Sequence, residues 1–477
     1  MTEKIKFGTD GWRAIIADQF TFENVERVAF AVGTYVKNEY ALSDENSARD
    51  KPILIGYDTR FLADKFAERA GHILFSMGIS VRISQRDVPT PCIAFAAQNK
   101  PTCGALQFTA SHNPPEYCGI KYIPHFGGPA TNSITNEIAK HLDAIPQNYD
   151  FTRGKIETFD PMPEYLDALR RFVDLEKLGT AKIRIGYDAL FSTSRGYLDK
   201  LIEEAKLPVS ILHAHRDPLF GGGMPEPKPE FLKELIELIK QDNLDVGVAT
   251  DGDADRFAVI DENGECFSAN QLLCLLTRHL VKNRGLRGAI VRTVGTTHLL
   301  DKMGKMYGLD VIETPVGFKY IGEQMRLRDV LIGGEESGGV SVKGHIPEKD
   351  GILANLLVLE MMEFEKKPIS KIWHDLVAEI GSDFVAKRAD MHLTAATQKA
   401  LMKHLIDSPP QEIAGEKVVK IGLSDGLKLY LDDFTFVLVR PSGTEPILRV
   451  SYEAPDSERI EKIMGAFKKH SEDVLKT

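Results

Sequence analysis

A serine and a histidine stand side by side in the segment 109–114, Thr-Ala-Ser-His-Asn-Pro, which ends an apolar run over 104–108. Because an Asn-Pro pair stops an extended run, these polar side chains are expected in a loop at the carboxyl end of a strand. Ligands gather at such edges of α/β sheets. The residues allow two interpretations: an ordinary polar turn, or a loop in which the Ser111 hydroxyl carries a phosphoryl group beside His112.

Three carboxylates, Asp251, Asp253 and Asp255, occupy alternate positions directly after another apolar run. This density of oxygen ligands suits a hard cation such as Mg²⁺ or Ca²⁺, which would also relieve their mutual repulsion. An EF-hand is excluded because Arg256 stands where that loop requires glycine. A phosphatase with the first aspartate as nucleophile is a second interpretation, although Asp255 stands where threonine is expected. We predict a cation that neutralises phosphate charge.

A candidate phosphate-binding loop lies near the C-terminus, in the segment 440–446, Arg-Pro-Ser-Gly-Thr-Glu-Pro, after an apolar strand. The guanidinium of Arg440 can bind phosphate through two parallel hydrogen bonds. The hydroxyls of Ser442 and Thr444, with the backbone N–H groups around Gly443, would complete an anion site.

A glycine-rich loop over 333–339 also follows an apolar strand and carries Glu335 and Ser337. These two side chains could exchange hydrogen bonds with the vicinal hydroxyls of a sugar ring. Just downstream, His345 and Lys349 supply an imidazole and an amine before a predicted helix.

The elements that must position these loops form a repeated pattern. The stretch 53–58, Ile-Leu-Ile-Gly-Tyr-Asp, returns as Ile-Arg-Ile-Gly-Tyr-Asp at 183–188, each ahead of a helical stretch. Strand-like runs over 244–250 and 288–294 continue the alternation, and Asp456 can cap a C-terminal helix. Alternation of this kind predicts α/β layers, and the repeat predicts related modules rather than one large sheet.

The composition limits the class of protein. A chain of 477 residues and 53.1 kDa is expected to form about three or four domains. The net charge of −10 argues against nucleic-acid binding but not against a local anion site. Five cysteines without CxxC spacing predict reduced thiols in a cytoplasmic protein. With no long apolar run and no signal-peptide core, neither a membrane span nor secretion is expected.

Taken in order, these loops resemble those of the α-D-phosphohexomutase superfamily, the phosphoglucomutases and phosphomannomutases. The resemblance runs from Phe7-Gly-Thr-Asp-Gly-Trp-Arg13 through the serine, metal and sugar loops to the phosphate loop. It implies an α/β fold of three similar mixed domains and a smaller C-terminal α+β domain. With polar and Pro-rich connections as boundaries, the expected domains are 1–150 (serine loop), 151–262 (metal loop), 263–372 (sugar loop) and 373–477 (phosphate loop).

The resemblance also implies roles for single residues. Ser111 resembles the phosphoserine, with His112 beside it, while Lys121 and Lys349 match two positions considered for the general acid or base. The three aspartates resemble the ligands of Mg²⁺, to which the serine phosphate would add another, and hexose 1,6-bisphosphate is the implied activator. The implied substrate contacts are Arg13, Arg256, Thr314, Gly317, Lys319, Glu335, Ser337, His345, Arg440, Ser442, Gly443 and Thr444.

One position departs from the family pattern. The phosphomannomutase and phosphoglucosamine mutase branches usually have histidine where this chain has Gly339, so His345 or Lys349 is expected to do the acid–base work. The turn 314–319 resembles the phosphoglucomutase branch, which favours glucose over mannose.

The expected activity is reversible phosphoryl transfer between C1 and C6 of a hexose phosphate, through phosphorylated Ser111 and a 1,6-bisphosphate. Alternatives are a hexose 1,6-bisphosphate synthase, a phosphomannomutase or phosphoglucosamine mutase, and a non-catalytic sugar-phosphate sensor. Because one loop must hold either phosphate end, a hinge is predicted near 366–384. The expected partner is a small sugar phosphate, with no nucleic acid or membrane, and the expected state is a monomer or weak homodimer.

Overall fold

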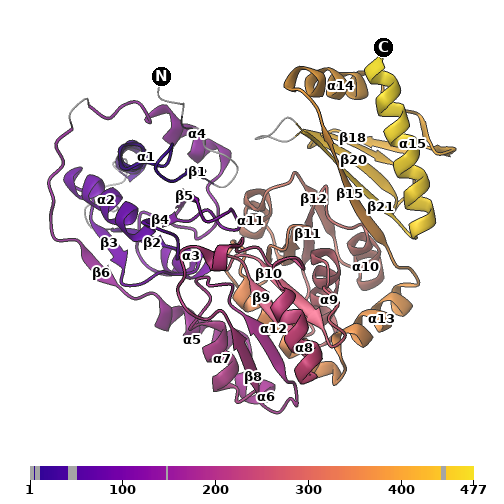
Figure 1. Cartoon of the computed structure of the whole chain (residues 1–477), viewed down its shortest axis with the longest axis horizontal. Helices are drawn as coiled ribbons and strands as arrows, with labels where there is room; N and C mark the ends of the chain where they lie inside the picture. The colour runs from indigo at the N-terminus through magenta and orange to yellow at the C-terminus, as the bar shows by residue number, and fades with distance from the viewer. Residues whose placement is uncertain (1–4, 6–10, 41–50, 147–148, 442–446, 477) are drawn as a thin grey trace.

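The computed structural model describes residues 5, 11–40, 51–146, 149–441 and 447–476, and it arranges them around four main sheets (Figure 1). Ser442, Gly443 and Thr444 of the predicted phosphate loop lie outside these residues, as do the first residues of the N-terminal motif. Three mixed α/β domains precede a smaller domain built on an antiparallel sheet, so the predicted fold class is confirmed.

Domain 1 carries the serine loop on a six-stranded sheet of order β1-β5-β4-β2-β3-β6, in which β5 runs antiparallel to both neighbours. The repeat stretch 53–58 forms β2, whose apolar residues are buried between helices. Tyr57 of β2 pairs with Phe108 of β4, so the corners after these two strands share one edge of the sheet. The elements are β1 (Trp12–Ile15), α1 (Phe22–Tyr40), β2 (Ile53–Tyr57), α2 (Ala63–Ser76), β3 (Val81–Ser84), α3 (Thr90–Asn99), β4 (Ala105–Phe108), β5 (Tyr117–Ile123), α4 (Asn132–Lys140) and β6 (Glu157–Phe159).

Domain 2 repeats the plan with a four-stranded sheet of order β10-β9-β7-β8. The second copy of the repeat forms β7, parallel to β8 and β9, and the antiparallel hairpin β9–β10 holds the acidic segment 251–256 at its turn. The elements are α5 (Met162–Phe172), α6 (Leu175–Leu178), β7 (Ile185–Asp188), α7 (Leu198–Glu204), β8 (Val209–Leu212), η1 (Phe220–Gly222), α8 (Lys233–Asp242), β9 (Val246–Thr250) and β10 (Phe257–Asp261).

Domain 3 has a four-stranded sheet of order β12-β11-β13-β14, with only β14 antiparallel to its neighbour. The apolar stripe on α9 packs into a hydrophobic core that continues without a break into domain 2. The elements are α9 (Ala269–Lys282), β11 (Ala289–Thr293), α10 (Leu299–Tyr307), β12 (Val311–Thr314), α11 (Phe318–Leu327), β13 (Val330–Gly334), β14 (Val340–Val342), α12 (Gly351–Glu365) and α13 (Ile369–Ile380).

Domain 4 is a five-stranded antiparallel sheet of order β15-β21-β20-β19-β18 with its own core and with α15 along one face (Figure 1). The helix α13 crosses the predicted boundary between residues 372 and 373 because Trp373 and Leu376 pack in the core of domains 2 and 3. The chain therefore leaves domain 3 after Gly381, which ends α13 in the left-handed conformation. The elements are β15 (Val385–His392), α14 (Ala395–Asp407), β16 (Glu412–Ile413), β17 (Glu416–Lys417), β18 (Lys420–Gly422), β19 (Leu427–Tyr430), β20 (Phe436–Pro441), β21 (Ile447–Ala454) and α15 (Ser457–Lys476).

Candidate active site

The serine loop is a buried corner after β4. Ser111 is only 1% exposed and has a φ of 52°, a left-handed conformation that is uncommon outside glycine. Its N–H donates to the Thr109 hydroxyl at 2.8 Å. Its own hydroxyl donates to Asp251 of domain 2 at 2.7 Å, so the predicted serine and acidic loops meet across the domain junction.

The backbones of these two loops also lie in close contact. A Cβ atom added at Gly252 would be 2.5 Å from the carbonyl oxygen of Ser111. His112 Nδ1 is 3.4 Å from Ser111 Oγ. Burial and the nearby Arg256 and Arg13 lower the pKa of His112 to about 2, so its imidazole is neutral.

The side chains of Asp251, Asp253 and Asp255 are buried, and one oxygen of each lies within 4.8 Å of the others. The Oδ1 atoms of Asp253 and Asp255 accept no hydrogen bond from any described residue. Buried carboxylate oxygens without donors, clustered at this distance, fit a divalent cation with oxygen ligands.

Lys121 enters this acidic cluster from β5 of domain 1. Its Nζ is 3.0 Å from Asp253 Oδ2 and 3.1 Å from Asp255 Oδ2, while the Thr90 hydroxyl donates to Asp253 at 2.6 Å. Burial raises the pKa of Asp253, but Lys121 and Thr90 outweigh it and lower that pKa to about 2. Burial and the other two aspartates hold the pKa of Asp251 well above its usual range. One ammonium therefore leaves excess negative charge in the cluster.

The sugar loop of domain 3 pairs directly with the metal loop. Arg256 forms an isolated β-bridge with Gly339, and the Phe257 N–H donates to the Gly338 carbonyl at 3.4 Å. Lys349 Nζ lies 3.2 Å from Asp255, so a second lysine, from domain 3, reaches the acidic cluster.

The departure at Gly339 has a physical explanation in Lys349. A Cβ atom at position 339 would lie 2.2 Å from Lys349 Cδ and 2.7 Å from its Cγ. The aliphatic part of Lys349 therefore occupies the space that a side chain at 339 would need. A side chain at 339 would therefore require Lys349 to leave its present position.

The predicted sugar-contact turn lies against the sugar loop. The Gly317 N–H donates to Glu335 at 3.0 Å, and burial raises the pKa of Glu335 to about 7. Lys319 donates to Asn132 of domain 1 at 2.6 Å. Ser337 is exposed, whereas the Thr314 hydroxyl is buried and donates to the Pro315 carbonyl at 3.1 Å.

Domain 4 reaches the same turn through Arg440. Its guanidinium pairs with Asp425 at 2.8 Å, and Asp425 also accepts the Val316 N–H at 2.9 Å. Arg440 therefore lies beside the turn 314–319. The other three predicted phosphate contacts, Ser442, Gly443 and Thr444, are outside the described residues.

Two further predicted contacts behave differently. Arg13 donates to Asn113 at 2.9 Å and so touches the serine loop. His345 instead pairs with Asp350 at 2.7 Å and packs edge-on against Phe172 at 5.9 Å between ring centres. Because Asp350 caps α12, these contacts give His345 a structural role and do not bring it to the acidic cluster.

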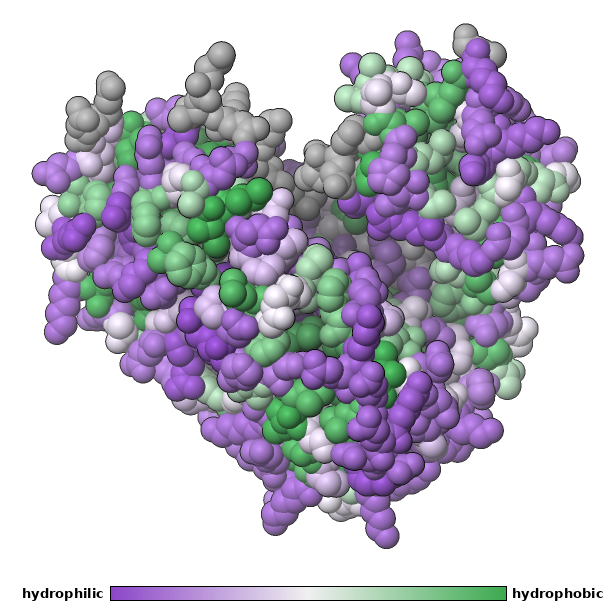
Figure 2. Space-filling model, viewed as in Figure 1, coloured by the Kyte–Doolittle hydropathy of each residue, from purple (hydrophilic) through white to green (hydrophobic). Residues whose placement is uncertain are grey.

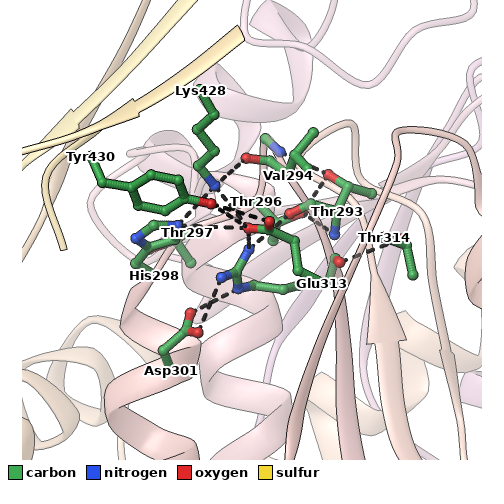
Figure 3. Close-up of polar contacts among 12 residues, drawn as sticks. Thr293, Val294, Thr296, Thr297, His298, Asp301, Glu313, Thr314, Lys428 and Tyr430 are labelled. Carbon is green, nitrogen blue, oxygen red and sulfur yellow. Dashed lines mark hydrogen bonds and ion pairs between the residues drawn. The ribbon is translucent and has the colours of Figure 1, made fainter. Parts of the chain in front are cut away.

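A hollow separates the lobe of domain 1 from the lobe of domain 4 (Figure 2). On the domain 4 side, Lys428 of β19 is buried against domain 3 (Figure 3). Its ammonium donates to the Val294 carbonyl at 2.6 Å and to His298 at 2.8 Å, and it pairs with Glu313 at 3.0 Å.

Sequence reasoning missed Lys428, Thr90 and Arg60, a buried arginine at the corner after β2. Lys428 and Thr90 stand in no recognisable motif. Arg60 stands two residues after Asp58, the last residue of the 53–58 repeat, so its position there was an available signal.

The comparisons with known proteins agree with this geometry. Family profiles described as phosphoglucomutase/phosphomannomutase α/β/α domains I, II and III match residues 4–149, 163–264 and 268–380, and the C-terminal domain profile matches 386–470. A phosphoglucomutase/phosphomannomutase of Thermococcus kodakarensis is 31% identical over 477 residues, covering 98% of this chain and 99% of that protein.

A phosphoglucosamine mutase of Methanococcus maripaludis is 30% identical over 467 residues, covering 96% of each chain. The fold matches a solved phosphoglucomutase/phosphomannomutase family protein of Burkholderia thailandensis with a TM-score of 0.84 at 21% identity, covering 100% of this chain and 98% of that one. None of the described helices has the length and apolar character needed to cross a bilayer. The chain belongs to the phosphoglucomutase/phosphomannomutase family and is a phosphohexomutase enzyme.

Proposed function

We propose that this phosphohexomutase interconverts glucose 1-phosphate and glucose 6-phosphate through phosphorylated Ser111. The observation that carries the proposal is the 2.7 Å contact between Ser111 Oγ and Asp251. It puts a hydroxyl nucleophile at the edge of a carboxylate cluster that suits a divalent cation.

Asp251, Asp253 and Asp255 would hold Mg²⁺, together with the phosphate on Ser111. When bound, the ion would neutralise charge on the phosphoryl group, which is the main catalytic requirement of such a transfer. Lys121, fixed between two of the carboxylates, would limit their repulsion and hold their orientation.

In the first half-reaction, O6 of glucose 1-phosphate attacks the phosphorus of phosphorylated Ser111. The O6–P bond forms as the Oγ–P bond breaks, Oγ keeps the electron pair, and Lys349 accepts the O6 proton as general base. The 1,6-bisphosphate then turns over. Oγ attacks the phosphorus at C1, the O1–P bond breaks, and O1 takes the proton back from Lys349, so the phosphoserine is regenerated.

Lys349 is assigned as the acid–base group because it reaches the cluster from the sugar-loop side and Gly339 leaves room for it. Lys121 lies 3.0 and 3.1 Å from Asp253 and Asp255 and would neutralise charge. Lys349 has longer ion pairs, 3.2 Å to Asp255 and 3.4 Å to Glu348. Glu335 and Ser337 would bind sugar hydroxyls. Arg440, with Ser442, Gly443 and Thr444, would hold the non-reacting phosphate in exchange for its present partner Asp425.

Reorientation of the intermediate would be helped by rotation of domain 4 about residues 381–384, because one phosphate loop must hold either end of the bisphosphate. Hexose 1,6-bisphosphate would act as activator by restoring phosphate to Ser111. Glucose is favoured by Lys349 and the turn 314–319. A phosphoglucosamine mutase is the second candidate, because a relative of 30% identity has that name.

A kinetic panel tests the proposal. Glucose, mannose and glucosamine 1-phosphates are compared with wild type and Ser111→Ala, with and without glucose 1,6-bisphosphate, while intact mass follows phosphate on the protein. We expect the fastest turnover with glucose 1-phosphate and none for Ser111→Ala. Accumulation of the free bisphosphate as product would instead indicate a bisphosphate synthase, and equal turnover by Ser111→Ala would exclude the serine from the mechanism.

A further inference from the structure

Arg60 is fully buried beneath the serine loop, 0% exposed, at the corner that follows β2. Its Nη1 donates to the carbonyls of Pro114 at 2.6 Å and Tyr117 at 2.9 Å. Its Nη2 donates to the carbonyls of Ser111 at 2.8 Å and Asn113 at 2.6 Å. One guanidinium therefore binds four carbonyls along the whole loop from the nucleophile to the start of β5.

The fifth donor of the guanidinium fixes Arg60 to its own strand. Nε pairs with Asp58 at 3.1 Å, and the Arg60 backbone N–H donates to the other oxygen of Asp58 at 2.9 Å. All five N–H bonds of the side chain thus have acceptors. Phe220 of domain 2 packs on the guanidinium, with its ring centre 5.0 Å away.

The second domain shows that this corner does not itself require arginine. In the repeat, Asp188 corresponds to Asp58, and its carboxylate likewise accepts the N–H of the residue two positions later, at 2.8 Å. That residue is Leu190, buried in an apolar cluster, and Asp188 pairs with His213 instead. Arginine is thus present at the corner of domain 1, which carries the serine loop, and absent from the corner of domain 2, which does not.

Ser111 needs such support because its backbone is held in an unfavourable conformation between two elements. Its φ of 52° is left-handed, and its carbonyl lies close enough to Gly252 that a Cβ there would be 2.5 Å away. Without Arg60, the carbonyls of Ser111 and Asn113 would lose their charged donor in a buried place. The loop could then shift relative to Asp251 and the acidic cluster.

We propose that Arg60 is a positioning residue that aligns the Ser111 hydroxyl, and the phosphate on it, for transfer. The inference rests on the proposed function of Ser111. Arg60 acts through the loop backbone and touches no substrate, so its loss lowers the rate of transfer rather than the binding of sugar phosphate. A misplacement of about 1 Å at a reacting group costs on the order of 100-fold.

The test compares Arg60→Lys and Arg60→Leu with wild type. Lysine has three donors and no fork, so it cannot bind four carbonyls and Asp58 together. Leucine copies the second corner. We expect kcat to fall by about 10- to 100-fold in Arg60→Lys and further in Arg60→Leu, with KM nearly unchanged and with slower phosphorylation of Ser111 by glucose 1,6-bisphosphate.

Arg284→Lys is the matched control. Like Arg60, Arg284 contacts a carboxylate, a carbonyl and an aromatic ring. Its guanidinium donates to Glu360 at 2.9 Å and to the Phe172 carbonyl at 2.6 Å, and it lies 5.2 Å from the centre of the Phe172 ring. None of these partners belongs to the candidate active site. The Arg284→Lys substitution is expected to lower the unfolding temperature and leave kcat unchanged. An equal loss of kcat in this control, or full kcat in Arg60→Lys, would overturn the inference.

Hydrogen exchange separates this inference from the proposed function. In Arg60→Lys, amides of the segment 111–117 should exchange faster while the rest of domain 1 stays protected. If wild type never acquires phosphate on Ser111, the proposed function fails, yet the exchange result still decides whether Arg60 holds the loop. Should both Arg60 variants fail to fold, Asp58→Asn, which keeps the arginine but weakens its anchor, is expected to show a smaller loss of kcat; unchanged kcat there would count against the inference.

Discussion

The junction between domains 1 and 2 and the junction between domains 3 and 4 each bury a lysine, but the charges around the two lysines differ. Lys121 faces Asp253 and Asp255, with Asp251 alongside in the same cluster. Even with Lys349 as a second ammonium, 3.2 Å from Asp255, three carboxylates face two lysines, and two carboxylate oxygens have no donor among the described residues.

Lys428 lies in a balanced network instead. With Arg292 it shares Glu313 at 2.7–3.0 Å, and Arg292 also pairs with Asp301 at 2.7 Å (Figure 3). His298 stays neutral because burial and Lys428 hold its pKa well below the usual range. Two cations thus match two carboxylates.

The contrast teaches how to distinguish a site from a structural contact when both are buried and charged. A balanced network has its groups mutually satisfied and stabilises two domains against one another. A cluster with excess charge and unsatisfied oxygens is costly unless something binds. The first junction therefore indicates function and the second indicates attachment.

Asp253→Asn should have the largest effect on the difference between the two junctions. It removes a charge from the unbalanced cluster, and we expect turnover to fall about 100-fold or more, with Mg²⁺ needed at higher concentration, because metal charge neutralisation is worth several kcal/mol. The measurement is a Mg²⁺ titration of initial rate. Asp301→Asn, in the balanced network, is the control and should lower stability without changing the Mg²⁺ dependence; equal Mg²⁺ dependence in both variants would contradict the contrast.

The two lysines provide the next comparison. Lys121→Met should lower turnover by about 10- to 100-fold, as lost positioning of charged groups does, while Mg²⁺ binds more tightly because a competing cation has gone. Lys428→Met should leave Mg²⁺ affinity unchanged and destabilise the protein by about 1–3 kcal/mol, since Arg292 still pairs with Glu313. Calorimetric Mg²⁺ titration and urea unfolding measure the two effects. Weaker Mg²⁺ binding in Lys121→Met would show that this lysine supports the metal rather than competing with it.

Gly339→Ala should have a smaller effect, through Lys349. Its Cβ would lie 2.2 Å from Lys349 Cδ, so the lysine must move, and we expect about a 10-fold loss of turnover with Mg²⁺ affinity retained. Gly465→Ala is the control: no described atom lies within 4 Å of its Cβ, so it should stabilise α15 by about 0.5–1 kcal/mol and leave turnover intact. Full activity in Gly339→Ala would argue against Lys349 as the acid–base group.

The last expected effect is on stability at alkaline pH. Burial and Arg292 lower the pKa of Lys428 to about 8, against about 10.4 for a free lysine. Between these values the folded protein binds fewer protons than the unfolded chain, so the free energy of unfolding gains a contribution that rises with pH. Urea unfolding from pH 7.5 to 10.5 should show this contribution in wild type and not in Lys428→Met. The same rise in both would mean that the charge on Lys428 is not the cause.

Much of the fold and of the candidate site was predictable because short segments of the sequence determine it. The repeat at 53–58 and 183–188 became β2 and β7, and the predicted cap Asp456 accepts the Arg459 N–H at 2.8 Å at the start of α15. The meeting of serine and acidic loops followed from a resemblance that spans the chain. Local pattern and ordered motifs were enough for these features.

Contacts between distant segments were not predictable in this way. The joint core of domains 2 and 3 arises because apolar stripes on different helices face one another, and a stripe does not name its partner. Arg60 binds four backbone carbonyls, which every residue has, and Lys428 binds a carbonyl besides Glu313 and His298. The contact between His345 and Asp350 was not predicted, because proximity in sequence to Lys349 does not fix which side of the loop a side chain takes.

The conflict between a side chain at 339 and the present position of Lys349 limits how such enzymes can diverge. A lineage that exchanges histidine at the first position for lysine at the second must pass through a state with both or with neither. In the first state Lys349 must shift, and the second lacks the amine that we propose as the proton carrier, so neither single substitution is expected to be neutral. The two residues should therefore be inherited together, as one character.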